Sequence, residues 1–122
     1  MLEQYVREAL RYLDDPIALE RNPLAGTALV VSLCQAEFER RTCARGLALA
    51  AVLRNALGEI SHDLPATPVG VLASLIREGR TQADAARIIG RSAEHVCRRW
   101  KPVLVRLVLD RMEQARVPQH AV

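Results

Sequence analysis

Three dipeptides in this 122-residue chain place a helix-capping side chain directly before a proline: Asp15-Pro16, Asn22-Pro23 and Thr67-Pro68. The capping oxygen can accept a hydrogen bond from the first helical turn. Proline suits the first helical position because its φ is fixed and it has no N–H to satisfy. Each pair therefore predicts the start of a helix, and no other local feature constrains the fold as strongly.

Composition favours an all-α fold. Half of the residues are hydrophobic and a quarter are charged, which excludes disordered and collagen-like chains. Only four residues are aromatic, and six glycines with six prolines supply too few turns for a many-stranded sandwich or barrel. We expect an N-terminal helical subdomain over residues 1–64, for packing or oligomerisation, and a second subdomain over residues 65–122.

Apolar periodicity predicts several helices in the N-terminal subdomain. The first is expected to end near Asp14, and a short helical turn to follow Pro16. Thr42 is expected to cap a helix whose small residues would let a neighbouring helix approach closely. A proline-containing segment then marks the boundary between the subdomains. The expected longer helices cover residues 3–13, 24–34 and 43–60.

The second subdomain begins with three short helical segments separated by glycines. Gly79 and Gly90 suit the left-handed conformation that ends a helix. Thr81 is expected to cap the second segment, with Asp84 completing a capping box, and Ser92 to cap the third. Two helices joined by a tight glycine turn form a helix-turn-helix arrangement. The segments cover residues 69–78, 82–89 and about 93–101.

The third segment has an apolar and a polar side. Val96 and Trp100, four residues apart, are expected to face inward, and the small Ala86 lies where the two helices cross. At about 100° per residue, the outward side chains are expected to be Glu94, His95, Arg98 and Lys101, with Arg91, Cys97 and Arg99 on the flanks. Outward residues of such a helix are available to the major groove of DNA.

Residues 78–100 resemble the helix-turn-helix of sigma-factor region 4 and of the related LuxR-type regulators. The resemblance rests on Glu78-Gly79 before the capping Thr81, on the core positions Ala86, Ile88, Ile89, Gly90, Ser92 and Val96, and on the basic Arg99. Arg91 stands where that family usually has an apolar residue, and an arginine at this place could reach a phosphate.

The resemblance implies a sequence-specific transcriptional regulator that binds double-stranded DNA, with RNA polymerase as a further partner. Arg98 is the candidate for bidentate contact with guanine, and Glu94 and His95 are candidates for neighbouring base edges. The expected phosphate contacts are Arg91, Ser92, Arg99 and Lys101. The alternative is a module that binds the transcription machinery or another protein through the same surface. No phosphate-binding loop or nucleophile motif supports an enzyme, so we expect none.

The charge is distributed unevenly along the chain. Residues 1–76 hold seven arginines against nine carboxylates, a net charge of −2. Residues 77–122 hold nine arginines and one lysine against five carboxylates, a net charge of +5. This asymmetry fits an anionic partner at one end of the molecule, most commonly nucleic acid, although a merely solvated basic face is the alternative.

Pro102 predicts that the third segment ends or kinks near Lys101, with a separate final helix after it. That helix carries two apolar stripes, and either the N-terminal subdomain or a second copy of the chain could cover the second one. Because one short recognition helix reads only a few base pairs, we predict a homodimer. The first stripe of the final helix is Leu104, Leu107 and Val108. The second stripe, whose residues are the expected contacts of the homodimer, is Val105, Leu109 and Met112.

The three cysteines are odd in number and lack paired spacing, so we expect neither a disulfide scaffold nor a zinc site. The histidines at positions 62, 95 and 120 are scattered, and we expect no metal or cofactor. Cys97 lies among arginines, and a redox switch there is the alternative to an inert thiol. With no signal-peptide pattern and no membrane-spanning run, we expect a cytoplasmic protein.

Overall fold

The computed structural model describes residues 2–116, and it confirms the all-α fold: this part of the chain forms helices and contains no strand. Among these residues, no helix combines the length and hydrophobicity that crossing a membrane requires. The N-terminal helices are α1 (Leu2–Arg11), α2 (Pro16–Glu20), a 3₁₀ turn (Pro23–Gly26), α3 (Ala28–Leu33), which continues into a π-helical turn (Cys34–Phe38), and α4 (Ala44–Asp63).

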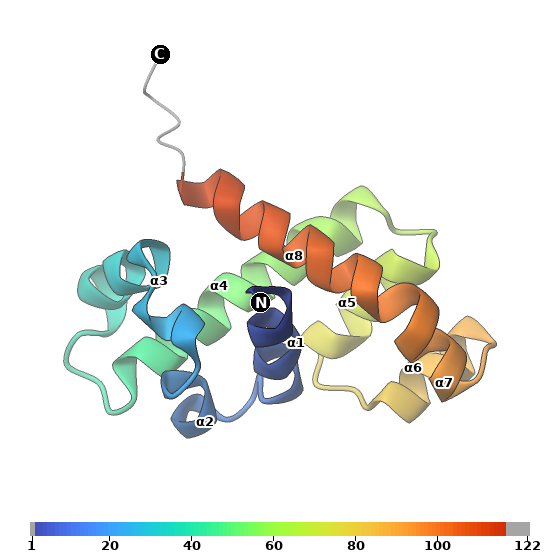
Figure 1. Ribbon diagram of the computed structural model, residues 1–122, viewed down its shortest axis with the longest axis horizontal. Coiled ribbons are helices and arrows are strands. Elements are labelled where there is room, and N and C mark those ends of the chain that lie inside the picture. The colour runs from blue at the N-terminus through green and yellow to red at the C-terminus, as the bar shows by residue number, and fades with distance from the viewer. Residues whose placement is uncertain (1, 117–122) are drawn as a thin grey trace, which may run out of the picture.

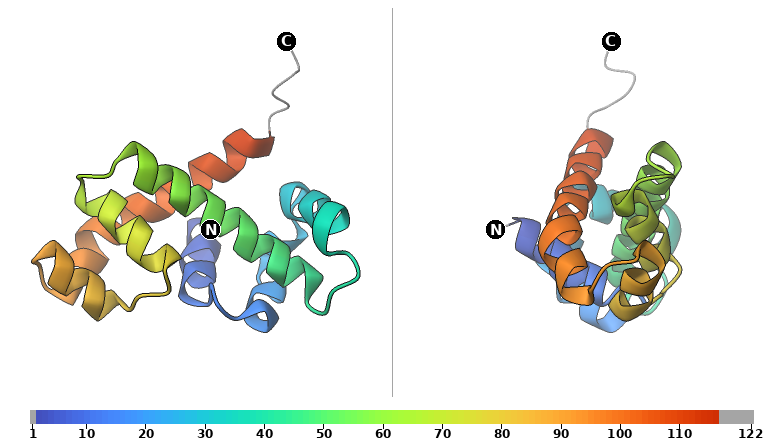
Figure 2. Two further views of the ribbon diagram at one scale, coloured as in Figure 1. Left: turned by 180° about the vertical axis from the view of Figure 1, so that it is seen from behind. Right: turned by 90° about the vertical axis from the view of Figure 1, so that its right-hand side faces the viewer.

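The C-terminal helices are shorter until the last one. They are α5 (Pro68–Arg77), α6 (Gln82–Ile89), α7 (Ala93–His95), a π-helical turn (Val96–Trp100) and α8 (Lys101–Arg116). Helices α6 and α7 occupy one end of the molecule and α3 lies toward the other, while α8 runs between the two ends (Figure 1). Seen from the α6–α7 end, α8 lies on one side and α4 on the other (Figure 2).

All three cap–proline pairs begin helices as predicted. The Asp15 side chain accepts a hydrogen bond from the Ala18 N–H (3.2 Å), that of Asn22 from Leu24 (2.9 Å), and that of Thr67 from Gly70 (3.0 Å). Each cap satisfies an N–H group that the helix itself leaves unpaired, a contribution of about 1 kcal/mol per cap.

One hydrophobic core includes residues from both halves of the chain. The long α4 is its centre and contacts α2, α5 and α8. Four of its large apolar side chains are no more than 1% exposed, and each contributes about 1.5–3 kcal/mol by leaving water. They are Leu49, Leu53, Leu57 and Ile60.

Two N-terminal expectations were wrong. Residues 24–34 do not form one helix, because Thr27 is extended (ψ 154°) and its hydroxyl donates to the Leu24 carbonyl (2.7 Å), which separates the 3₁₀ turn from α3. Thr42 does not cap α4. Cys43 is the N-cap instead, in the left-handed conformation (φ 55°) and without a side-chain capping bond, so the turn geometry and not a hydroxyl sets the start of α4.

The expected break at Pro102 is replaced by a π-helical turn, and α7 continues into α8. The Lys101 N–H donates to the Val96 carbonyl, five residues back, and the backbone at His95, Val96 and Lys101 stays in the right-handed helical region. Because Pro102 has no N–H, the Arg98 carbonyl lacks its ordinary helical partner, and a wider turn is one way to accommodate this.

The apolar residues of α8 are covered within the chain. Leu104, Val105, Val108 and Met112 are at most 5% exposed, and α8 contacts α1, α3, α4 and α5. Of the two alternatives, the N-terminal helices therefore cover the second stripe. Val105 and Met112 are unavailable as contacts to a second copy, and Leu109 is partly buried. Val105 and Met112 were wrongly assigned to a dimer surface because the sequence does not show which helix lies over which stripe.

Candidate nucleic-acid interface

Helix α6 begins at the predicted capping box. The Asp84 N–H donates to the Thr81 hydroxyl (3.2 Å), and the Thr81 N–H donates to the Asp84 carboxylate (3.4 Å). Hydrogen bonds from the side chain and backbone of Thr81, together with the nearby Arg87, hold the pKa of Asp84 below its ordinary value. The box fixes the residue at which α6 starts, and so the position of the turn that follows.

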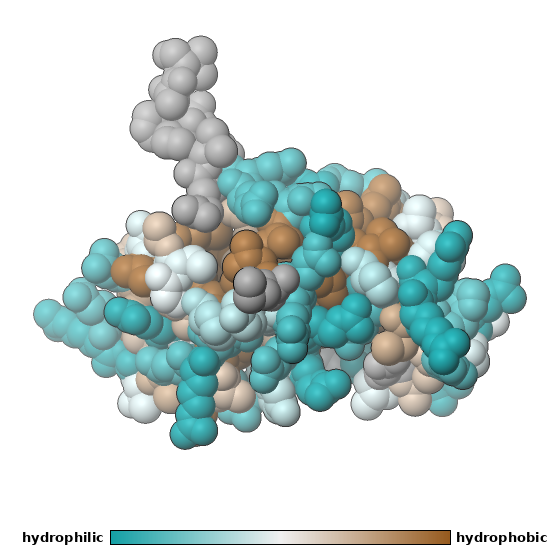
Figure 3. Space-filling view, in the orientation of Figure 1, coloured by the Kyte–Doolittle hydropathy of each residue, from teal (hydrophilic) through white to brown (hydrophobic). Residues whose placement is uncertain are grey.

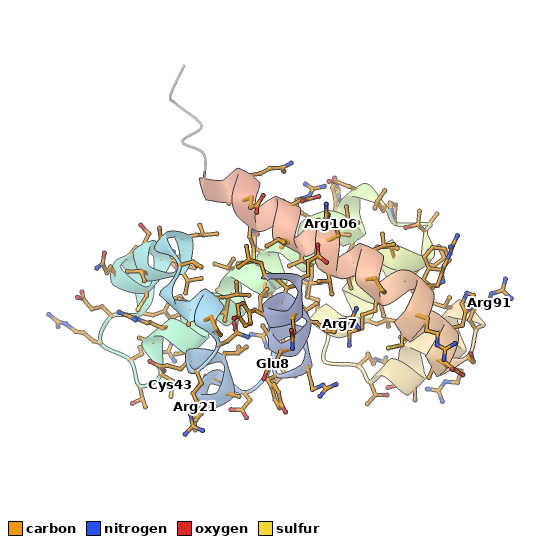
Figure 4. All side chains as sticks on the ribbon, in the orientation of Figure 1. Arg7, Glu8, Arg21, Cys43, Arg91 and Arg106 are labelled. Atoms are coloured by element: carbon orange, nitrogen blue, oxygen red, sulfur yellow. The ribbon has the colours of Figure 1, made fainter. Side chains whose placement is uncertain are left out.

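Gly90 forms the turn between α6 and α7. Its φ of 80° and ψ of 28° are left-handed, and its N–H and that of Arg91 both donate to the Ala86 carbonyl (2.9 and 3.0 Å). The Arg91 side chain is exposed and lies at the far end of the molecule (Figure 4). An arginine is tolerated in place of an apolar residue here because the side chain points away from the turn.

Small and branched side chains pack α6 and the π-helical turn after α7 against the core. Ala85, Ala86 and Val96 are 1%, 6% and 0% exposed. Ile88, one of the core positions of the resemblance, is instead 53% exposed. The reason is angular: Ala85, Ala86 and Ile89 define the inward side of α6, and Ile88 lies at its edge. Ala85 is a buried position that the sequence analysis missed.

The opposite side of α7, and of the π-helical turn that continues it, faces solvent. Ser92 caps the helix by accepting from the His95 N–H (3.1 Å), and four exposed side chains line an open depression beside it: Glu94, His95, Arg98 and Arg99. Arg98 pairs with Glu94 across one helical turn (2.7 Å), with both side chains largely exposed. Such a pair is worth about 0.3–0.5 kcal/mol, so Arg98 can exchange this partner for another at little cost.

Trp100 supports the flank of this surface. The Arg99 guanidinium lies 5.6 Å from the centre of the Trp100 ring, and the His95 ring meets it edge-on at 6.4 Å. Trp100 is partly buried, and its indole N–H is buried without a hydrogen-bond partner among the residues that the structure describes. Cation–π contact with Trp100 orients Arg99 next to His95.

Lys101 does not point outward with Arg98 as expected. It is partly buried and lines a pocket against α1, beside Leu10 and Arg11. A regular helix would turn Lys101 about 140° away from Val96, but the π turn holds one extra residue and sets Lys101 back by about 100°. It therefore lies near the inward side, and the phosphate contact expected of it loses its geometric basis.

The exposed surface around α6 and α7 is basic. Residues 81–100 hold four cations, all of them exposed arginines, and two carboxylates. Arg87 pairs with Asp84 (2.7 Å) and Arg98 with Glu94, while no ion pair within residues 2–116 involves Arg91 or Arg99. Hydrophilic side chains predominate over this end of the molecule, whereas hydrophobic ones appear along α8 (Figure 3). The structure thus brings Ser92, Glu94, His95, Arg98 and Arg99 together at one depression, with Arg91 exposed next to Ser92 in the chain and without Lys101.

Other candidate chemistry is sparse. No group of three histidine, cysteine or carboxylate side chains within residues 2–116 is placed to hold a metal ion. All three cysteines are free thiols, and Cys97 is partly buried. His120 lies outside the described residues.

Comparisons with known protein families, with curated proteins and with solved structures gave no match for this chain.

Proposed function

We propose that α6, the Gly90 turn, and α7 with the π-helical turn that continues it form a DNA-binding helix-turn-helix, and that the protein is a sequence-specific transcriptional regulator. The observation that carries this proposal is the division of one short helix into two sides. Val96 is fully buried, while Glu94 and Arg98 on the opposite side are exposed, with Arg91, His95 and Arg99 around them. Packing alone does not require so many exposed donors beside one capped helical turn.

The residues take different roles in this proposal. Arg98 is the candidate for a guanine edge, because its planar guanidinium can donate two hydrogen bonds to O6 and N7. Arg91 and Arg99, which carry no intramolecular ion pair in the described structure, are the candidates for phosphates, and Ser92 can add a hydroxyl contact. A homodimer remains part of the proposal, since a second copy doubles the length of DNA that is read. Sedimentation at micromolar concentration tests it, and a monomer mass when bound tightly to one site would contradict it.

The test begins with selection of bound duplexes from a random pool, followed by fluorescence anisotropy on the selected duplex at several salt concentrations. Each phosphate contact contributes about −0.9 to the slope of log K against log salt. Arg91→Ala should therefore make the slope shallower by about one unit. Arg21→Ala is the matched control, because it removes the same charge from an exposed arginine far from Arg91 (Figure 4) and should leave the slope unchanged.

The second candidate function is a protein-interaction module that contacts the transcription machinery through this surface. The exposed Ile88 beside the basic side chains favours it, because an apolar side chain at the edge of a polar surface suits a protein partner. This alternative predicts no enrichment of any duplex sequence and equal effects of Arg91→Ala and Arg21→Ala on residual DNA binding.

A further inference from the structure

A pocket of about 410 Å³ lies behind the proposed recognition helix, between α1, α5 and the start of α8. Its size falls within the range of roughly 300–1,000 Å³ that is typical of small-molecule sites. Val96 is part of its lining, so the pocket touches the side of the helix opposite Arg98. The floor is apolar and largely buried, and is formed by Leu10, Leu13, Leu72, Ile76 and Val96.

Cations gather at the α1–α8 side of this pocket. Lys101 lines it beside Arg11, and two kinds of charge act on Lys101: those of Arg7 and Arg11 on α1, and that of the Cys97 thiolate. Burial lowers the pKa of Lys101 and the like charges of Arg7 and Arg11 lower it further, whereas the Cys97 thiolate raises it. Within residues 2–116, none of Arg7, Arg11 and Lys101 forms an ion pair. Arg7 extends from α1 toward the C-terminal helices (Figure 4).

Elsewhere along the contact between α1 and α8, a cation has a carboxylate partner, which Arg7, Arg11 and Lys101 lack among the described residues. One and two turns before Arg7 and Arg11, Glu3 of α1 pairs with Arg106 of α8 (2.5 Å). Where α1 next meets α8, Arg7 and Arg11 lie near Lys101, and no carboxylate within residues 2–116 forms an ion pair with any of the three. The lining also holds a third cation, Arg80, and two carboxylates, each with a partner outside the pocket lining: Asp14 pairs with Arg54 (2.5 Å), and Asp15 caps α2.

We propose that this pocket binds a small organic anion, whose carboxylate or phosphate group lies between Lys101 and Arg11 and whose apolar part packs on Leu10 and Leu72. The anion supplies the negative charge that Arg7, Arg11 and Lys101 lack as a partner between α1 and α8 in the described part of the chain. The apolar floor favours an organic molecule over a free inorganic ion. A half-buried lysine favours a small ligand over a DNA phosphate, because a duplex cannot enter a pocket of this size. This proposal stands apart from the DNA-binding one.

The experiment titrates the isotope-labelled full chain with phenylacetate and hexanoate, and with their neutral amides, while backbone amide resonances are followed by NMR. Saturable shifts are expected at Leu13, Gly79 and Thr81 for the acids, with at least tenfold weaker binding of the amides. Lys101→Met should weaken binding of the acids at least tenfold, and its unchanged spectrum elsewhere would show that it folds. Arg106→Met, which removes an α8 cation outside the pocket, is the matched control and should bind as the wild type does.

Three results would overturn the inference. The first is that neither acid produces saturable shifts at the pocket. The second is that the acids and the amides bind equally. The third is that Lys101→Met binds the acids as well as the wild type does. If the acids fail to bind and Lys101→Met instead weakens binding of a selected duplex, the cluster serves DNA phosphates. That outcome would reject the small-anion site while leaving the proposed DNA binding intact.

Discussion

Replacing Gly90 by alanine tests the turn on which the proposed interface depends. Gly90 has a φ of 80°, and a Cβ built there would meet no other atom within 4 Å, so the substitution adds backbone strain without a steric clash. An L-residue in the left-handed conformation costs about 1–2 kcal/mol. Alanine also stiffens the unfolded chain, which returns about 0.4–1 kcal/mol. Gly90→Ala is therefore expected to destabilise the fold by about 1 kcal/mol.

Gly26→Ala provides the matched control. A Cβ at Gly26 also meets nothing within 4 Å, but the backbone there is not left-handed. Because the effect on the unfolded chain is the same in both variants, their difference isolates the conformational cost, about 1–2 kcal/mol. Thermal unfolding followed by circular dichroism should show Gly90→Ala melting several degrees below Gly26→Ala, with Gly90→Asn between them. Equal stability of the two alanine variants would refute the left-handed turn.

Two further predictions concern packing and pH. Gly46→Ala places a Cβ 2.0 Å from the Pro16 carbonyl oxygen and should destabilise the fold by about 1–3 kcal/mol. Gly58→Ala meets only side-chain atoms of Arg77, the nearest at 3.3 Å, and should be neutral or stabilising. Urea unfolding of the two variants would contradict the α2–α4 contact if both behaved alike. The lowered pKa of Asp84 means that its contribution to stability is present above its unfolded pKa and is lost as pH falls through the folded one. The stability gap between wild type and Asp84→Asn should thus narrow below about pH 4, and a constant gap in unfolding curves from pH 7 to 3 would oppose this assignment.

The parts of the fold that the sequence predicted correctly are local ones. Caps at Asp15, Thr67 and Thr81, and the left-handed Gly90, depend on a few neighbouring residues, and all of them are present in the structure. Thr42 shows the limit even of this reasoning, because a good capping residue is not used when the preceding turn places Cys43 at the helix start. Local signals identify where helices begin but not how the chain enters them.

Features that depend on the whole fold could not be read from the sequence. The inward position of Lys101 follows from the π turn before Pro102. The predicted orientation assumed 100° per residue along the whole helix, which does not allow for the extra residue of a π turn. The burial of Val105 and Met112 follows from the course of α8 across the N-terminal helices, which no pattern within α8 reveals. For the same reason the pocket beside Lys101 was not foreseen, since α1 supplies part of its wall.

The most direct test of the central claim is a double-substitution cycle between Arg98 and one guanine of the selected duplex. Arg98→Ala removes the donor, and 7-deazaguanine removes the N7 acceptor in the major groove. Affinities of the four combinations are measured at one salt concentration. If Arg98 reads that guanine, each change alone should cost about 1–3 kcal/mol and the two together no more than the larger of them. Additive losses at every guanine tested, or a duplex that binds Arg98→Ala as tightly as the wild type, would contradict the claim that residues 93–100 read DNA.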